Sequence, residues 1–212
     1  MILYYSPLSN YCSKVKFLID YKDIKVDLIP PPGGYGSDIF KKISPLGSIP
    51  TLKHNNMILY ESEIINEYLN ELYPTPPMLT NDIELNARIK MISRFHNTKL
   101  EPSIRSFFKY KKKYSYNDII EDFVNLENQL KIFNTIINDT KYIAKDAITL
   151  ADCPFPSWFA LFDIFCDHFK KKIILKGKIK KYYQNLLDNK FMRNQYNDYY
   201  QNALKWSKES LL

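Results

Sequence analysis

The sequence predicts a mixed α/β domain followed by an all-helical domain, and three observations lead to this prediction. Short apolar segments alternate with helical patterns over the first 74 residues, which is typical of a small sheet with helices on its faces. The segment Pro74-Thr75-Pro76-Pro77 then forms a stiff break. After this break the chain has helical periodicity and no convincing strand. We therefore expect domains at residues 1–76 and 80–212.

In the first domain, the elements are expected in the order strand, helix, strand, helix, strand, strand, helix. A strand–helix–strand unit predicts a parallel pair, and two adjacent strands predict a hairpin. In the first helix, apolar residues recur at helical spacing, and Lys14, Lys16 and Lys22 are expected on its outer face. The predicted strands are residues 2–5, 25–29, 50–53 and 57–60. The first helix is predicted around Val15 to Ile19, a short second helix over residues 37–43, and a third helix from Ile64 to Leu72.

In the second domain, helical patterns cover about residues 82–111, 116–138, 149–166 and 178–188, with more helix near the C-terminus. The segment from Thr149 to Asp152 matches a reciprocal N-cap pattern, with aspartate in the fourth place. We interpret both residues as structural. Trp158 and Phe162 follow in an apolar run and are expected in the core.

The charge of the chain is uneven. The net charge is +7, with −1 in residues 1–80 and +8 in residues 81–212. Only 4 of the 30 basic residues are arginine, so the forked side chains that recognise phosphates and bases are scarce. This composition argues against nucleic acid as a partner. The three cysteines and three histidines are scattered, and we expect free thiols and no metal site.

The N-terminus carries no sign of a targeting segment. It lacks a basic region followed by a long apolar one, as a signal peptide requires. No window approaches the roughly 20 apolar residues that span a bilayer. We therefore expect a cytoplasmic protein without a membrane partner.

Two segments of the first domain point to a binding site for a small peptide-like anion. Pro50 stands at the start of a strand, where an X–Pro bond can be cis and leaves the backbone of Ile49 free to pair with a ligand. Glu61 and Ser62 stand between a strand and a helix. A helix N-terminus and a serine hydroxyl suit a carboxylate, and the Glu61 carboxylate suits an ammonium group. An isolated Pro50 or Ser62 is also explained as a strand start or a helix cap.

With these motifs in this order, the chain resembles the cytosolic glutathione S-transferases. The Pro-x-Gly-x-Ile-Pro loop at 45–50, the Glu61–Ser62 pair and the Thr-Leu-Ala-Asp cap at 149–152 carry the resemblance over essentially the whole chain. It implies a thioredoxin-like N-terminal domain and glutathione as co-substrate. It also implies a cis bond at Pro50, a backbone clamp at Ile49 and a γ-glutamyl site at Glu61 and Ser62. It further implies a detoxifying transferase that acts on small electrophiles as a homodimer.

Three residues compete for the role of controlling the glutathione thiol. Ser9 stands just before the first helix and resembles the serine of serine-type, bacterial-like transferases, with Asn10 where proline is common. Tyr5 ends the first strand, at a spacing that resembles tyrosine-type transferases. Cys12 sits at the second thiol position of a Cys-x-x-Cys motif whose first position is Ser9. We place Ser9 first and Tyr5 second, and we interpret Cys12 as a structural thiol.

The resemblance leaves more than one function open. The leading hypothesis is glutathione conjugation or a related glutathione-dependent reaction. The segment Tyr73-Pro74-Thr75-Pro76-Pro77-Met78 also resembles the stringent-starvation proteins, which have the transferase fold and act on RNA polymerase without catalysis. Intact Ser9, Pro50 and Glu61–Ser62 favour the enzyme. A third hypothesis is ligand storage or a structural role. It stays open because the residues that bind a ligand overlap with those that would catalyse a reaction.

Overall fold

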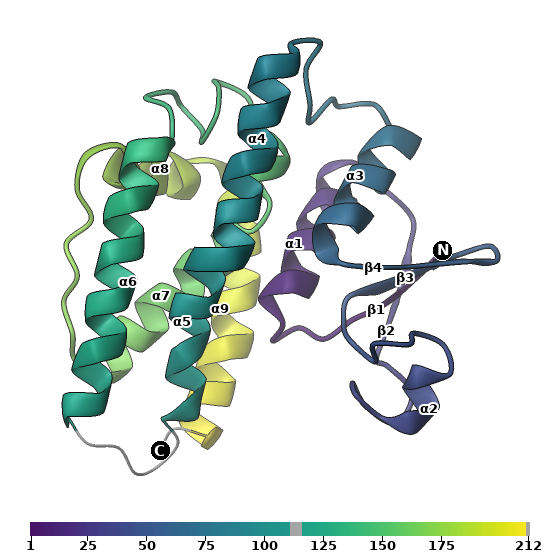
Figure 1. The fold of residues 1–212 in the computed structure, drawn as a ribbon, viewed down its shortest axis with the longest axis horizontal. Coiled ribbons are helices and arrows are strands. Elements are labelled where there is room, and N and C mark those ends of the chain that lie inside the picture. The colour runs from purple at the N-terminus through teal and green to yellow at the C-terminus, as the bar shows by residue number, and fades with distance from the viewer. Residues whose placement is uncertain (111–115, 211–212) are drawn as a thin grey trace. The chain divides into compact units, whose positions relative to one another are not determined.

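The structure of the protein, a computed structural model, describes residues 1–110 and 116–210 (Figure 1). The chain divides into two compact units, Met1–Met78 and Leu79–Leu212. The first unit holds a four-stranded mixed sheet with helices, and the second is helical and without strands in its described part. This architecture confirms the predicted fold class.

The elements of the first unit follow the predicted order, and their bounds differ from the predicted ones by at most five residues, the largest difference being at the start of the first helix. They are β1 (Ile2–Tyr4), α1 (Asn10–Tyr21), β2 (Asp27–Ile29), α2 (Asp38–Lys41), β3 (Thr51–His54), β4 (Met57–Tyr60) and α3 (Ser62–Leu72).

The four strands form one sheet in the order β2-β1-β3-β4. β1 pairs in parallel with β2, and Leu3 lies opposite Leu28. β1 pairs antiparallel with β3, where Leu3 lies opposite Leu52. β3 and β4 form an antiparallel hairpin, whose turn holds Asn55 at a φ of 54°, a conformation that asparagine tolerates. The predicted parallel pair and the predicted hairpin are both confirmed.

Helices cover both faces of this sheet. Leu3 and Tyr4 are neighbours on β1, so their side chains point to opposite faces. The ring of Tyr4 lies 5.1 Å from that of Phe40 in α2, which places α2 on one face. α1 and α3 pack against each other on the other face (Figure 1). Val15 of α1 and Ile65 of α3 are completely buried there.

Two lysines that were expected on the outer face of α1 are buried instead. Lys14 is 1% exposed, and its Nζ lies 3.3 Å from Oε1 of Glu63 in α3. The Asn66 side-chain amide donates to the carbonyl oxygen of Lys14 at 3.3 Å. Lys22 Nζ donates to the carbonyl oxygen of Tyr73 at 2.7 Å. The prediction of an outer face was wrong for Lys14 and Lys22 because both ammonium groups find partners, and a paired charge can be buried.

The second unit consists of helices of several kinds. η1 is one turn of π-helix, and η2 and η3 are short 3₁₀ helices. The elements are α4 (Ile83–Phe95), η1 (His96–Leu100), α5 (Glu101–Arg105), η2 (Ser106–Lys109), α6 (Tyr116–Ile136), η3 (Leu150–Asp152), α7 (Phe155–His168), α8 (Gly177–Asp188) and α9 (Lys190–Ser210).

The core of the second unit is aromatic and centres on α7. Phe155 of α7 stacks on Phe133 of α6, with ring centroids 4.9 Å apart. Trp158 is completely buried, and its indole N–H donates to the carbonyl oxygen of Leu100 at 3.3 Å. Phe162 is 3% exposed. The prediction that Trp158 and Phe162 belong to the core is therefore confirmed.

Two of the predicted helices are interrupted, and proline lies at or near each interruption. The helix over 82–111 breaks into α4, η1, α5 and η2, and Pro102 in this stretch has no N–H to continue an α-helical ladder. Residue 111, at its predicted end, lies outside the described residues. The helix over 149–166 becomes η3 followed by α7, which starts only at Phe155, beside Pro154 and Pro156. None of the described helices is long and apolar enough to cross a membrane.

Candidate functional site

The candidate site lies at one end of the sheet, where the strand register brings three loops together. Thr51, the first residue of β3, pairs with Tyr4 at the end of β1 and with Tyr60 at the end of β4. The loop after β1, the loop before β3 and the loop after β4 therefore meet the sheet at the same end. These three loops carry the predicted site residues, which are Tyr5 and Ser9, Ile49 and Pro50, and Glu61 and Ser62.

Ser9 occupies the N-cap position of α1. Its backbone is extended, with φ −90° and ψ 115°, and its Oγ accepts a hydrogen bond from the Cys12 N–H at 3.3 Å. Its own N–H donates to the carbonyl oxygen of Ser6 at 3.1 Å. The cap uses one lone pair of the hydroxyl oxygen, so the same group can cap α1 and donate its proton to a ligand. The capping and the catalytic interpretations of Ser9 are compatible.

Tyr5 and Cys12 lie on either side of Ser9 in the chain and differ in their access to solvent. Tyr5 is half-buried, and its N–H donates to the Ile29 carbonyl oxygen at 2.8 Å, directly beyond β1. Cys12 is completely buried within α1. Burial raises the pKa of its thiol to about 11, and a hydrogen bond with Ser9 lowers it by less. The Cys12 thiol is therefore neutral and inaccessible at pH 7, which favours Ser9 and Tyr5 over Cys12 as the group beside a ligand thiol.

The loop before β3 presents a free stretch of backbone. The bond between Ile49 and Pro50 is cis. Thr51 is completely buried, and its Oγ1 donates to the Ser48 carbonyl oxygen at 2.8 Å and lies 3.0 Å from Ser44 Oγ. These contacts fix the loop to the start of β3. Within the described residues, neither the N–H nor the C=O of Ile49 forms a hydrogen bond, so both can pair with an extended ligand.

Gly47 holds this loop close to the loop that precedes α2. Its φ is +60°, and its carbonyl oxygen accepts a hydrogen bond from the Gly36 N–H at 2.7 Å. A Cβ at position 47 would lie 3.1 Å from the Cα of Gly36 and 3.1 Å from Cγ of Lys41. Both the backbone conformation and the close approach therefore require glycine at this position.

We expect the substitution Gly47→Ala to lower the free energy of unfolding by about 2 kcal/mol. It places a side chain on a backbone in the left-handed region, and its Cβ lies too close to neighbouring atoms. Gly34→Ala is a matched control, since Gly34 has φ +88° but no heavy atom within 4 Å of its added Cβ. The control should cost about 1 kcal/mol through its backbone alone. Urea unfolding measures both values. Equal costs for the two variants would show that the close approach of Gly47 to Gly36 has no effect on stability.

The Glu61–Ser62 pair forms an uncapped start of α3. Glu61 has φ 73° and ψ 111°, a conformation that side-chain-bearing residues seldom adopt, and its exposed side chain does not cap the helix. Ser62 is 4% exposed. Among the residues that the structure describes, neither its N–H nor its hydroxyl has a hydrogen-bond partner. The strained backbone and the unused donors together point to a ligand site.

The sheet end therefore collects groups of complementary chemistry. The N-termini of α1 and α3 favour negative charge. The Glu61 carboxylate favours an ammonium group, and the backbone of Ile49 favours a peptide. A small peptide-like anion that carries both a carboxylate and an amino group matches this set. The hydroxyl of Ser9 adds a further donor, because its N-cap bond uses only the oxygen.

The prediction of the site missed one contribution to its geometry. The buried ion pair between Lys14 and Glu63 joins the helix that starts after Ser9 to the helix that starts at Ser62. The available signal was that Lys14 precedes Val15 on the apolar side of the helix and that Glu63 directly follows Ser62. No group of three or more His, Cys, Asp or Glu side chains that could hold a metal occurs within residues 1–110 and 116–210.

Comparisons with known proteins identify relatives of this chain. A family model described as the N-terminal domain of glutathione S-transferase matches residues 3–77. A probable glutathione transferase of Aplysia californica is 33% identical over 81 residues, which cover 37% of this chain and 88% of that protein. A stringent starvation protein A homolog of Coxiella burnetii is 24% identical over 160 residues, which cover 72% of this chain and 71% of that protein.

Solved structures resemble the whole described fold. The apo form of human glutathione-S-transferase T1-1 is similar with a TM-score of 0.83 at 20% identity, covering 96% of this chain and 89% of that one. A diazinon-metabolizing glutathione S-transferase of the silkworm Bombyx mori has a TM-score of 0.80 at 17% identity and covers 95% of this chain and 98% of that one. At these identities the likeness establishes the fold.

Proposed function

Because the chain belongs to the glutathione S-transferase family, we propose that it binds glutathione and activates its thiol for attack on a small electrophile. The observation that carries this proposal is the strand register, which brings the loop that leads to α1, the start of β3 and the loop that leads to α3 to one end of the sheet. Glutathione is a small peptide-like anion with the carboxylate and amino groups that these elements suit.

Each part of glutathione has a proposed partner. The γ-glutamyl carboxylate lies at the N-terminus of α3, where the N–H and hydroxyl of Ser62 donate to it. The γ-glutamyl ammonium group pairs with the Glu61 carboxylate. The cysteinyl backbone pairs with the N–H and C=O of Ile49 as an added strand. This placement directs the cysteinyl thiol towards the loop after β1.

Thiol activation is the chemical step. A thiol with a pKa near 8.5 is largely protonated at pH 7, so it is a poor nucleophile. Donation from the Ser9 hydroxyl and the N-terminal dipole of α1 stabilises the thiolate, and the thiol proton passes to solvent. The thiolate sulfur then forms a bond to the electrophilic carbon, and the leaving group departs with its bonding electron pair. Tyr5 is the second candidate for the donor.

A second candidate function is binding without catalysis. The similarity to the Coxiella burnetii starvation protein homolog extends over 160 residues, twice the 81 residues matched in the Aplysia californica transferase. The segment from Tyr73 to Met78 also resembles that class in sequence. Under this proposal the chain binds RNA polymerase and does not use glutathione as a substrate.

Calorimetric titration of the full chain with glutathione separates the two proposals. The transferase proposal requires a saturable heat and, in a parallel assay, conjugation of a model aryl halide. Absence of glutathione binding would contradict the transferase proposal outright. Saturable binding with no conjugation of the aryl halide would favour the binding protein over the enzyme.

We expect Glu61→Gln and Ser62→Ala each to weaken glutathione binding by about tenfold, because each removes one charge-assisted hydrogen bond to the ligand. Calorimetry measures the two dissociation constants. Glu71→Gln is the matched control, since Glu71 is an exposed carboxylate at the far end of the same helix. An effect of Glu71→Gln as large as that of Glu61→Gln would show that net charge, and not contact at position 61, governs binding.

A further inference from the structure

The second unit contains a groove that the proposed function does not use. Its volume is about 450 Å³, and it lies between α6 and the segment that connects α7 to α8. Figure 1 shows this segment running along α6. The apolar residues that line the groove are Leu130 of α6, Ile173, Ile174 and Leu175 of the segment, and Ile179 of α8.

Contacts at its two ends attach the connecting segment to α7 and α6. At its start, the Lys171 N–H donates to the Cys166 carbonyl oxygen at 2.9 Å. At its end, the Ile179 N–H donates to Asn134 Oδ1 at 3.1 Å. Gly177 has φ +57°, and a Cβ there would lie 3.0 Å from the Asn134 side-chain amide, so the chain lies tight against α6 at this point. The segment between the two ends is fixed beside the groove.

The middle of this segment offers an unpaired backbone edge. Ile173 and Leu175 are half-buried, whereas Ile174 between them is 66% exposed, which is the alternation of an extended strand. Within residues 1–110 and 116–210, no backbone group of Ile174 or Leu175 forms a hydrogen bond. Such an edge can pair with an extended chain.

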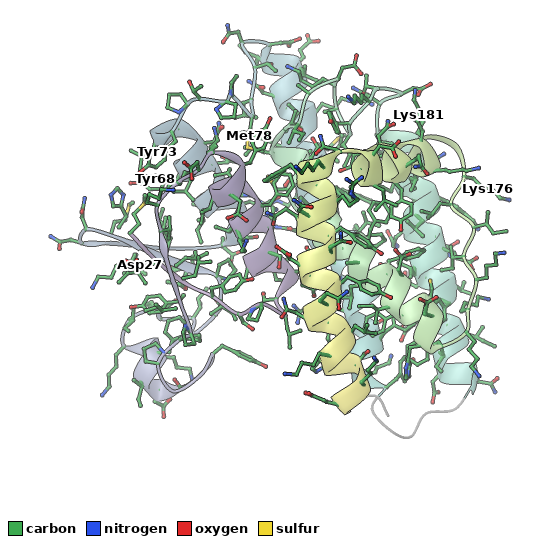
Figure 2. The ribbon with its side chains drawn as sticks, turned by 180° about the vertical axis from the view of Figure 1, so that it is seen from behind. Asp27, Tyr68, Tyr73, Met78, Lys176 and Lys181 are labelled. Carbon is green, nitrogen blue, oxygen red and sulfur yellow. The ribbon has the colours of Figure 1, made fainter. Side chains whose placement is uncertain are left out.

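The rim of the groove is positively charged. It holds Lys131, Lys172 and Lys176, against a single carboxylate at Glu127. The ammonium group of Lys131 lies 3.4 Å from the Asn128 side-chain oxygen, and neither Lys172 nor Lys176 has an ion-pair partner among the described residues. The exposed Lys176, labelled in Figure 2, extends away from the ribbon. Residues 170–181 include seven lysines and no acidic residue.

We propose that this groove binds an extended acidic peptide that carries aliphatic side chains. The aliphatic floor, the unpaired edge at Ile174–Leu175 and the lysine rim each match one feature of that partner. Nucleic acid fits less well, because the lining has neither arginine nor an aromatic side chain for base stacking. A membrane surface fits less well because the apolar side chains line a concavity. The proposal is independent of glutathione binding.

Fluorescence anisotropy with the full chain tests this proposal. The probe is a labelled ten-residue peptide of alternating glutamate and valine, and the control peptide has lysine in place of glutamate. We expect saturable binding of the glutamate peptide only, weakened about tenfold between about 50 mM and 500 mM salt. Absence of binding at millimolar protein, or equal binding of both peptides, would overturn the proposal.

Variants locate the binding within the groove. The double substitution Lys172→Glu with Lys176→Glu should weaken binding at least about tenfold. The control pair, Lys180→Glu with Lys190→Glu, makes the same change in net charge at exposed positions outside the groove lining and should weaken it less than about threefold. Ile174→Lys adds a positive charge and removes an aliphatic contact. We expect this substitution to weaken binding of the glutamate peptide. Stronger binding would show that charge attraction alone governs the interaction, and it would overturn the proposal.

The variant Lys172→Glu with Lys176→Glu also distinguishes an acidic peptide from RNA and from an anionic membrane as the partner of the groove. Single-stranded RNA of about 20 nucleotides and anionic lipid vesicles are titrated as alternative probes at equal salt. Weaker binding of both probes than of the glutamate peptide supports the proposal. Tighter binding of either probe, lost in Lys172→Glu with Lys176→Glu, would assign the groove to that partner instead. Far-ultraviolet circular dichroism of each variant verifies that the fold is retained.

Discussion

Ser9→Ala is expected to lower kcat/KM for the conjugation of an aryl halide by about a hundredfold, because it removes a hydrogen-bond donor that acts on the developing thiolate. The affinity for glutathione should change by less than about threefold, since the ligand carboxylate and backbone contacts lie at Ile49, Glu61 and Ser62. The pKa of the bound thiol should rise towards the value of free glutathione. Ultraviolet absorbance of the thiolate as a function of pH measures this shift.

The role of Ser9 as a helix cap requires a separate control. Removing the cap costs about 1 kcal/mol of stability by itself. Ser9→Asp keeps an oxygen that caps α1 but offers no donor to the thiolate, so it should retain stability and lose activity. Ser9→Thr restores a hydroxyl and should recover much of the activity. Full activity in Ser9→Ala, with loss of activity in Tyr5→Phe, would transfer the role to Tyr5.

Much of the first unit was predictable because short-range patterns determine it. Short apolar segments marked the strands and period-3.6 spacing marked the longer helices in order, and this order predicted the parallel pair and the hairpin. The candidate site follows from the same cause. Once β1, β3 and β4 are adjacent, the residues just beyond Tyr4, just before Thr51 and just beyond Tyr60 must share one end of the sheet.

The errors concern effects that depend on distant partners. Lys14 follows the polar rule for a helix surface until Glu63, 49 residues later, provides a buried counter-charge. Lys22 likewise depends on a carbonyl oxygen at Tyr73, 51 residues later. Local pattern does not identify which distant residue serves as the partner. The break at η1 has a local cause, Pro102, and it also lies where α4, α5 and α6 contact η1. Helical periodicity in the sequence continues across this break and does not reveal it.

The groove of the second unit was beyond prediction for a related reason. The segment of residues 170–181 reads in sequence as a basic stretch, which is most often a solvated helix face. Its position beside α6 depends on the contacts of Gly177 and Ile179 with Asn134, which the sequence does not reveal. Lysines and aliphatic residues then line one concavity, whereas the sequence shows them only as neighbours.

Asp152→Ala is expected to lower the free energy of unfolding by about 3 kcal/mol or more, because it leaves several buried donors without an acceptor. The predicted reciprocal pattern with Thr149 is present at η3. The Asp152 carboxylate is completely buried and accepts the Thr149 N–H at 2.8 Å, the Thr149 hydroxyl at 2.9 Å and the Ile143 N–H at 3.2 Å. Asp146→Ala is the matched control, since Asp146 is exposed and accepts the Lys141 N–H at 2.7 Å. It should cost less than about 1 kcal/mol.

The pH dependence of the same site gives a sharper test. Burial raises the pKa of Asp152 to about 6, and the hydrogen bonds from Thr149 and Ile143 lower it by less. A folded-state pKa above the unfolded value, near 4, means that the folded chain binds the proton more tightly. The stability contributed by this group is therefore fully present below about pH 4 and is lost as the pH rises through about 6.

Asp152→Asn removes this titration while every other group still titrates. The difference in unfolding free energy between the wild type and Asp152→Asn isolates the Asp152 carboxyl, because the remaining groups cancel. We expect the wild type to lose roughly 2–3 kcal/mol relative to the variant between pH 4 and pH 7, as two pKa units imply. Urea unfolding at a series of pH values measures the difference. A wild type that gains stability relative to Asp152→Asn over this range would mean that the three hydrogen bonds outweigh burial and hold the carboxylate ionised.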